Sequence, residues 1–583
     1  MTRIRIALTI SGATSLGAFE GGALAALITG VQATQRLNAD RKRPDLRIDA
    51  IGGSSAGAIT AVIAARALAA GLNPVDAMEQ AWVRLDSVDQ LLEGAGHKAP
   101  FSVQNLDKQA SALLEPPNHI PDPLVVQECP VQIRLTLCNL RGLDYRFKRL
   151  RGPDGGSGAA RTPGDHRRPI TANTYLDWAD FKATPGGRLA DMTRLKGRSP
   201  VDAALASGAN ELGFPPRLLS IERAEYERNG VINLAAGTES LWYTDGGTLE
   251  NEPLGRTLDL TNEIDRNPRD GSNHTDDRRL HLLIHPFPER VVPTGSDAWA
   301  NPDRQPTWLR TLTRALSIVR SQSLYADLKQ AEKVNSRMIW QQRLQQSIEQ
   351  LLASMPVEQQ QRWREELSGV LADFEEDHRQ LRPPRSQSSY SAPQDGTTAA
   401  DLLGQAIEHV SGLSGKNLVA IDVISPYLAA DTEGIPLEDL LAGEFLYSFG
   451  GFLDEGLRRS DFALGFVCML NWMSKGLEGY GLSAEQVDAA LQASLRAFYR
   501  LKPWSRCGET KGFAGYGLNE EMTAKASAMG LAAGSSWTVV DFGRTRLATL
   551  PTAEQLFLLR ITWRVVRVLA RDLWLKWRGL DRP

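Results

Sequence analysis

The segment GGSSAG at residues 52–57 is the feature that most constrains the fold. Residues 53–57 fit the pattern G-x-S-x-G, with Ser55 at its centre. A strand pattern precedes it at 46–51, and small and apolar residues typical of a helix follow at 58–72. A serine on such a turn lies at the positive end of a helix dipole, and the glycines permit strained backbone angles. Ser55 is therefore a candidate acyl-accepting nucleophile, although a bare G-x-S-x-G also occurs in plain strand-to-helix turns.

The length allows roughly two to four domains, and the composition is that of a globular protein. The chain has 583 residues, of which 42% are hydrophobic and 23% are charged. A formal net charge of −3 argues against nucleic-acid binding as the main task. The four cysteines are scattered, which indicates neither a disulfide framework nor a zinc site, and we expect no metal or other cofactor. Neither a secretory signal nor a long apolar span is visible, so we expect a cytoplasmic protein.

The pattern of elements changes along the chain and indicates several regions. Over 1–290, strand and helix patterns alternate, which predicts an α/β domain with a mostly parallel central sheet flanked by helices. Gln, Glu, Arg and Leu dominate 300–381, which predicts a long helical insertion. The composition of 382–399 is that of a linker. The region 400–583 is mainly helical in pattern, with an apolar strand at 418–424 that suits a place in the core sheet.

A serine hydroxyl needs a base to accept its proton, and two candidate bases follow strand patterns. Asp245 comes directly after the strand pattern 241–244 and is followed by two glycines, which allow close approach to another backbone. On its own, such an Asp-Gly-Gly is most often a turn. Among the eight histidines, His285 is the best placed, after the apolar strand 280–284. A Ser-His-Asp esterase is therefore an alternative, although a loop histidine before proline is the commoner case.

A loop of small residues links the first strand to the first helix at residues 11–17. Its sequence is SGATSLG. A small-residue loop at a helix N-terminus presents backbone N–H groups, which suit an oxyanion. Taken alone, the same loop fits a plain strand-to-helix turn.

Taken in order, these motifs resemble the patatin-like phospholipases. The loop at 11–17, GGSSAG and DGG occur in that family's order over residues 4–253. Ala206-Ser207 and Phe214-Pro215-Pro216 are similar to stretches that the family carries before the aspartate, and Asn251 and Pro253 fit its N-x-P after DGG. More weakly, residues 449–465 resemble a segment found after the catalytic domain in some bacterial members.

The resemblance implies a lipid acyl hydrolase of the phospholipase A type with a Ser-Asp dyad and an acyl-enzyme intermediate. Ser55 would be the nucleophile and Asp245 the general base. The oxyanion hole implied by the resemblance consists of backbone N–H groups of Gly12, Ala13, Thr14, Ser15, Leu16 and Ala56. The glycines that support these motifs are Gly17, Gly53, Gly57, Gly246 and Gly247.

The first loop departs from the family pattern of three glycines, a variable residue, a basic residue and glycine. Ala13 and Thr14 replace two glycines, and Leu16 stands where arginine or lysine is expected. Backbone donors survive this change, but the positive charge does not. A weakened or non-catalytic member that binds lipid or serves as a scaffold is therefore a further alternative.

The pattern at 556–577 predicts a basic amphipathic helix. Arg560, Arg564, Arg567 and Arg571 recur at spacings of four, three and four, with tryptophans beside them. Such a helix can lie in a membrane interface, which would make the protein peripheral at the membrane. A helix packed on the protein with a solvated arginine stripe is the alternative interpretation.

Overall fold

The computed structural model describes the following residues: 3–38, 45–84, 91, 99–114, 122–127, 130–147, 170–191, 200–211, 213–228, 230–266, 278–288, 307–381, 398–411, 413, 418–444, 448–502, 504–506, 509–511, 513, 515–531, 538–539, 541, 566–567 and 570. The helix expected at 556–577 therefore lies almost entirely outside the described residues and stays a prediction. The linker at 382–399 also lies outside them, apart from its last two residues.

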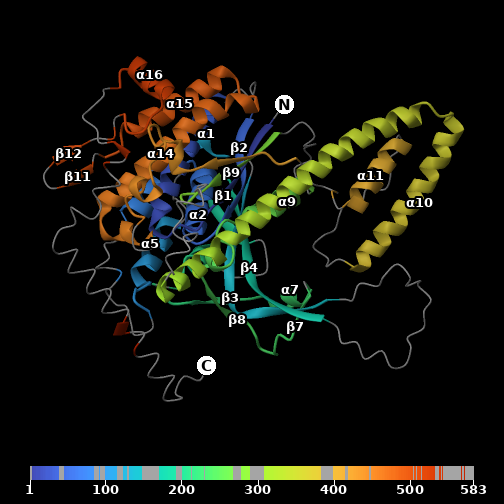
Figure 1. The fold of residues 1–583 in the computed structure, drawn as a ribbon, viewed down its shortest axis with the longest axis horizontal. Helices are drawn as coiled ribbons and strands as arrows, with labels where there is room; N and C mark the ends of the chain where they lie inside the picture. The colour runs from blue at the N-terminus through green and yellow to red at the C-terminus, as the bar shows by residue number, and fades with distance from the viewer. Residues whose placement is uncertain are drawn as a thin grey trace.

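The centre of the described structure is a mixed sheet with helices on both faces (Figure 1). Its main path runs β10-β9-β1-β2-β3-β4-β5. The pairs from β10 to β3 are parallel, and the pairs that β3 forms with β4, β7 and β8 are antiparallel. The strands are β1 (Arg3–Ile10), β2 (Asp45–Gly53), β3 (Val131–Phe147), β4 (Ile170–Thr184), β5 (Arg188–Asp191), β6 (Arg217–Ser220), β7 (Val231–Ile232), β8 (Ser240–Thr244), β9 (Arg278–Ile284) and β10 (Ile421–Ile424). The predicted α/β class with a mostly parallel sheet and a mainly helical C-terminal region is confirmed.

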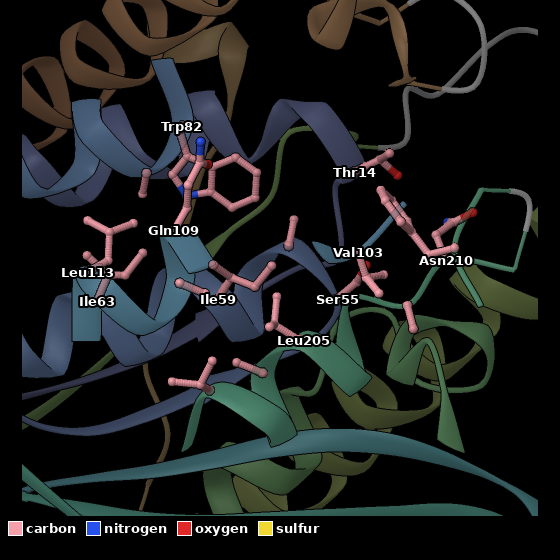
Figure 2. A pocket seen from close by; sticks show the side chains of 18 of the residues that line it. Thr14, Ser55, Ile59, Ile63, Trp82, Val103, Gln109, Leu113, Leu205 and Asn210 are labelled. Carbon is pink, nitrogen blue, oxygen red and sulfur yellow. The ribbon is translucent and has the colours of Figure 1, made fainter. Parts of the chain in front are cut away.

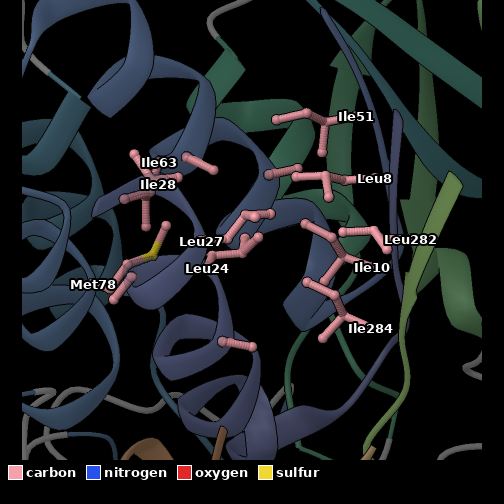
Figure 3. Close-up of a cluster of buried hydrophobic side chains, with 14 of the residues drawn as sticks. Leu8, Ile10, Leu24, Leu27, Ile28, Ile51, Ile63, Met78, Leu282 and Ile284 are labelled. Carbon is pink, nitrogen blue, oxygen red and sulfur yellow. The ribbon is translucent and has the colours of Figure 1, made fainter. Parts of the chain in front are cut away.

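One face of the sheet is covered by α1 (Gly17–Leu37) and α2 (Ala56–Ala70). Apolar residues alternate along β1, so Leu8 and Ile10 point to this face (Figure 3). Leu24, Leu27 and Ile28 of α1 pack against them and are fully buried. This layer is the main hydrophobic core of the protein.

The opposite face is covered by α8 (Leu254–Arg266). Here Arg5 of β1 and Arg279 of β9 form ion pairs with Asp49 of β2 and Asp265 of α8, at 2.5 to 2.7 Å. Burial alone would raise the pKa of Asp49, but the guanidinium groups of Arg279 and Arg5 hold it below its usual value. This face therefore combines paired charges with a small apolar cluster of Ala7, Ala50 and Leu260.

The C-terminal region is part of the same body. Strand β10 pairs in parallel with β9, which places the segment expected at 418–424 at the end of the sheet. Helices α14 (Glu455–Gly476) and α15 (Ala484–Phe498) pack beside α1 (Figure 1). The contact is close because a Cβ at Gly465 of α14 would collide with the carbonyl oxygen of Phe19. The N-terminal half and the C-terminal half thus share one core.

Helix α1, with the turn that precedes it, is the one described helix long and apolar enough to cross a membrane, at Thr14–Leu37. Of its most apolar window, 89% is buried inside the protein. Its hydropathy follows from its position, since the sheet, α2, α14 and α15 surround it. We therefore interpret it as a core helix.

Three further helices, α9 (Trp308–Ala353), α10 (Val357–Leu381) and α11 (Ala399–Ser411), form an extension on the other side of the molecule (Figure 1). The stretch 300–381, predicted as a helical insertion, contains α9 and α10. Helix α11 packs against both, because Leu402 contacts Leu367 and Leu371 of α10, and Ala399 and Ala400 contact Leu352 of α9.

The crossing of α1 and α14 predicts a sharp contrast between two glycine substitutions. Gly465→Ala should lower the free energy of unfolding by about 3 kcal/mol, because the two helix backbones must separate. In Gly369→Ala, on α10, the added Cβ meets no atom within 4 Å, so the substitution should raise helix stability by about 0.5–1 kcal/mol. Thermal unfolding followed by circular dichroism measures both. Equal midpoints for the two variants would contradict the close crossing.

Candidate active site

Ser55 occupies a strained turn between β2 and α2. Its backbone angles are φ 53° and ψ −122°, a region that non-glycine residues rarely occupy. The turn packs tightly on the end of β1, since a Cβ at Gly57 would collide with the carbonyl oxygen of Ile10. The N–H of Ser55 donates to the hydroxyl of Ser207 at 2.9 Å. The sequence pattern predicted such an elbow, and the structure has these angles at Ser55.

The hydroxyl of Ser55 faces the carboxylate of Asp245. Ser55 Oγ donates to Asp245 Oδ2 at 3.0 Å, and both residues are buried. Asp245 directly follows β8 and caps a short 3-10 helix, η4 (Gly246–Thr248). The two residues are 190 positions apart in sequence. The fold therefore brings together the nucleophile and the base implied by the resemblance, at a distance that permits proton transfer.

Neighbouring groups fix the carboxylate of Asp245. Asp245 Oδ1 accepts from the N–H of Gly247 at 2.8 Å, and Oδ2 accepts from Asn210 Nδ2 at 3.3 Å. The backbone N–H of Asp245 donates to Ala209 O at 3.1 Å. These bonds orient one carboxylate oxygen towards Ser55, as a general base requires.

The sequence pattern indicates no catalytic role for Asn210 or Ser207. Ser207 is the last residue of α6 (Pro200–Ser207), and Asn210 follows that helix. Ser207 bonds to Ser55, and Asn210 bonds to Asp245. The available signal was the stretch ALASGAN, which resembles the family in its alanine and serine. Nothing in the stretch itself shows that Asn210 would reach Asp245, because that contact depends on how α6 packs against β8.

The loop at residues 12–17 lies beside Ser55, and two of the N–H groups expected to bind the oxyanion are already hydrogen-bonded within the protein. The N–H of Gly12 donates to Asn251 O at 2.8 Å, and the N–H of Leu16 donates to Ala13 O at 2.9 Å. The expectation that Gly12 and Leu16 would hold an oxyanion is therefore wrong for this conformation, because both N–H groups already have acceptors. Ser15 stays in the set, within the turn η1 (Thr14–Leu16).

Among the described residues, the N–H groups of Ala13, Thr14 and Ala56 have no protein acceptor. Thr14 has a positive φ of 53° and lines the same cavity as Ser55. Ala56 is the first residue of α2 and adds the positive end of that helix. The remaining donors thus come from the two sides of Ser55, the 12–17 loop and the α2 N-terminus.

An elongated apolar cavity, partly open to solvent, begins at Ser55 (Figure 2). Thr14, Ser55 and Asn210 lie at one end, and Ile63, Leu113 and Trp82 lie at the other (Figure 2). Ile59 and Leu205 lie between them. The walls come from α2, α6, α5 (Gln104–Leu114) and the turn η2 (Glu79–Val83). The shape and lining suit a hydrocarbon chain whose carbonyl end is at Ser55.

His285 has its polar contacts with Ser11 and Glu252. Its Nδ1 lies 3.2 Å from Ser11 Oγ and 3.9 Å from Glu252 Oε1. Burial lowers the pKa of His285 to about 4, so the ring is neutral near pH 7. The hydroxyl of Ser55 donates to Asp245, which leaves the Ser-His-Asp alternative without the contact that it requires.

Residues 8–258 match the family described as patatin-like phospholipase. The chain therefore carries a patatin-like phospholipase domain. Members of this family are generally serine acyl hydrolases, and the family implies lipid acyl hydrolase activity and a lipid substrate. A search among curated proteins gives no match. The matched range ends inside α8, so β9, β10 and the helices from α9 onward lie beyond it, although both strands belong to the same sheet as the patatin-like domain.

The buried neutral His285 predicts how stability changes with pH. Its pKa is lower in the folded chain, about 4, than the ordinary value near 6.5, so the unfolded chain binds this proton first as pH falls. Its contribution to stability is complete above about pH 6.5 and decreases between pH 6.5 and 4. His285→Gln should therefore lose less stability than the wild type on acidification to pH 4.5, by an amount on the order of 2 kcal/mol.

Unfolding midpoints of both proteins at several pH values measure this difference. His285→Gln should also retain ester hydrolysis at pH 7, since the ring does not contact Ser55. A large loss of turnover in this variant, with Asp245→Asn still active, would support the Ser-His-Asp alternative instead.

Proposed function

We propose that this protein hydrolyses carboxylic ester bonds of membrane lipids, in the manner of a phospholipase A, with Ser55 as nucleophile and Asp245 as general base. The observation that carries the proposal is the 3.0 Å hydrogen bond from Ser55 Oγ to Asp245 Oδ2 at the end of an apolar cavity. The polar dyad suits the ester, and the cavity suits the acyl chain. The family supports the broader class of reaction.

In the acylation step, Asp245 accepts the proton of Ser55 as Oγ attacks the ester carbonyl carbon. The carbonyl oxygen becomes an oxyanion, and we assign its stabilisation to the N–H groups of Ala13, Thr14, Ser15 and Ala56. Collapse of this tetrahedral intermediate breaks the ester bond. The leaving alcohol takes the proton from Asp245, and the acyl group stays on Ser55.

In the deacylation step, water replaces the departed alcohol. Asp245 accepts a proton from that water, which attacks the acyl carbonyl, and the same oxyanion donors act again. The fatty acid leaves as Ser55 regains its proton. The dyad needs no histidine for this sequence, in agreement with the orientation of His285 towards Ser11.

We also propose that the protein works in the cytoplasm and contacts membranes peripherally. The support for membrane contact is the basic amphipathic pattern of 556–577, of which the structure describes only residues 566, 567 and 570. A lipid acyl hydrolase must reach lipid in a bilayer, and an interfacial helix is one way to do so.

The dyad predicts that two substitutions abolish catalysis and that an adjacent one does not. Ser55→Ala removes the nucleophile and Asp245→Asn removes the base, so each should lower kcat by at least about 10³-fold. Ser54→Ala is the matched control, because Ser54 is adjacent in sequence and its buried hydroxyl has no hydrogen-bond partner in the structure. Release of fatty acid from phospholipid vesicles measures turnover, and a fluorophosphonate probe reports the reactivity of Ser55.

The outcomes separate the proposal from its alternatives. Equal turnover in wild type, Ser55→Ala and Asp245→Asn would exclude the dyad mechanism. Vesicle binding without turnover or labelling in the wild type would favour a non-catalytic lipid-binding protein.

The cavity predicts a limit on acyl-chain length. Ile63 lines the end of the cavity remote from Ser55 (Figure 2). Ile63→Trp should shorten the cavity and lower kcat/KM for long acyl chains by about 10- to 100-fold, while short-chain esters keep their rate. A series of p-nitrophenyl esters of increasing chain length measures this. An unchanged chain-length profile would show that the acyl chain lies elsewhere.

A further inference from the structure

The side chain of Ser15, in the middle of the 12–17 loop, is bonded to the C-terminal half of the chain. Ser15 is fully buried, and its hydroxyl donates to the carbonyl oxygen of Ser448. The Ser15 hydroxyl oxygen in turn accepts a hydrogen bond from the backbone N–H of Gly451 at 3.1 Å. The partners are more than 430 residues away in sequence and lie outside the range that matches the family.

The segment that receives Ser15 is the turn η8 (Gly450–Leu453) and the residues before it. A Cβ at Gly451 would lie 2.7 Å from Ser15 Oγ, so the contact leaves no space for a side chain there. Phe452 of the same turn lines the cavity that begins at Ser55. One short segment therefore both contacts the 12–17 loop and forms part of the cavity wall.

Arg458, in the first turns of α14, holds this segment in place. It is 3% exposed, and its Nη1 donates to Gly451 O at 2.8 Å. Its Nε donates to Val83 O at 3.0 Å, at the end of η2. Burial lowers the pKa of Arg458 to about 10, and the side chain is still protonated at neutral pH. Arg458 thus links the segment that binds Ser15 to the turn that carries Trp82 of the cavity.

The 12–17 loop needs such support because its backbone is strained. Thr14 is β-branched and has a φ of 53°, a conformation that costs on the order of 1–3 kcal/mol and persists only where the surroundings impose it. On one side of Thr14, Gly12 exchanges two hydrogen bonds with Asn251, one from each residue. On the other side, Ser15 is bonded to Ser448 and Gly451. Both ends of the strained residue are therefore fixed by contacts outside the loop.

We propose that residues 448–458 complete the active site, and that Ser15, Gly451 and Arg458 are positioning residues that hold the 12–17 loop in the conformation that binds the oxyanion. The inference rests on the function proposed above. The donors it concerns are the N–H groups of Ala13, Thr14 and Ser15, which must point at the oxyanion before it forms. The C-terminal region is then a part of the catalytic unit. Arg458 acts through the 12–17 loop and does not contact the substrate.

Three variants of the full-length chain test this, with one matched control. Ser15→Ala removes the hydroxyl bridge. Arg458→Met removes the guanidinium, and Arg458→Lys keeps a cation that can still donate to one carbonyl. Ser460→Ala is the control, because Ser460 is equally buried on α14 but faces Tyr516, 3.4 Å away, and has no bond to the loop.

We expect Ser15→Ala and Arg458→Met to lower kcat about 10- to 100-fold with KM changed less than about threefold, a smaller loss than removal of an oxyanion donor. Arg458→Lys should recover part of the rate, and Ser460→Ala should match the wild type. The inhibition constant of a fatty trifluoromethyl ketone, which forms an oxyanion on the serine, should rise in parallel with the loss of kcat. The dissociation constant of the corresponding fatty alcohol should not, because it forms no oxyanion.

Two results would overturn the inference. One is an equal rise in the inhibition constant of the ketone and the dissociation constant of the alcohol. The other is a kcat in Ser15→Ala and Arg458→Met that equals that of Ser460→Ala. If Arg458→Met does not fold, Ser15→Ala and Arg458→Lys decide it. Failure of the proposed function gives a different result, a wild type without turnover. Hydrogen exchange of the backbone amides at 12–17 then provides the test. Unchanged exchange in Ser15→Ala would contradict the claim that the Ser15 hydroxyl holds the loop in place.

Discussion

The strained turn at Ser55 is the constraint on which the rest of the site depends. A serine at φ 53° costs on the order of 1–3 kcal/mol, so its surroundings must hold it there. Gly57 lets the start of α2 lie against the end of β1, and the hydroxyl of Ser207 accepts the N–H of Ser55. This turn places Ser55 Oγ within hydrogen-bond distance of Asp245 Oδ2. It also leaves the N–H of Ala56 at the positive end of α2 without a protein acceptor. The strain is thus confined to one turn, but the chemistry that it permits also depends on α2, α6 and the end of β8.

The site lies where the carboxyl ends of neighbouring strands meet. Strands β1 and β2 are parallel neighbours, so the loops that follow them, with residues 12–17 and Ser55, lie side by side at one edge of the sheet. Strand β8 is antiparallel to β3 and brings Asp245 to the same edge from a different direction. The order of strands therefore explains how residues far apart in sequence form one dyad. The C-terminal half adds β10 to this sheet and packs α14 on α1, which gives the patatin-like domain a covering that the family match does not include.

The sequence was most informative where function depends on local backbone. The elbow at Ser55, the strand before Asp245 and the loop at 12–17 are each contained in about ten residues, and their order supported one family over a bare motif. The occupied N–H groups of Gly12 and Leu16 could not be predicted, because an acceptor such as Asn251 is set by tertiary packing. The same holds for Asn210, whose partner Asp245 lies 35 residues further along the chain. It also holds for Arg458, which bonds to Gly451 and to Val83. These contacts depend on how the helices pack in the folded chain.

The most direct test of the account is to identify the residue that carries the acyl group during turnover. Wild-type protein is mixed with a lipid ester, quenched in acid within the steady state and digested, and its peptides are analysed by mass spectrometry. The Ser-Asp mechanism predicts an acyl adduct on the peptide that contains Ser55, with fragment ions that place it on Ser55 and not on Ser54. Continued release of fatty acid with the adduct on another residue would contradict it.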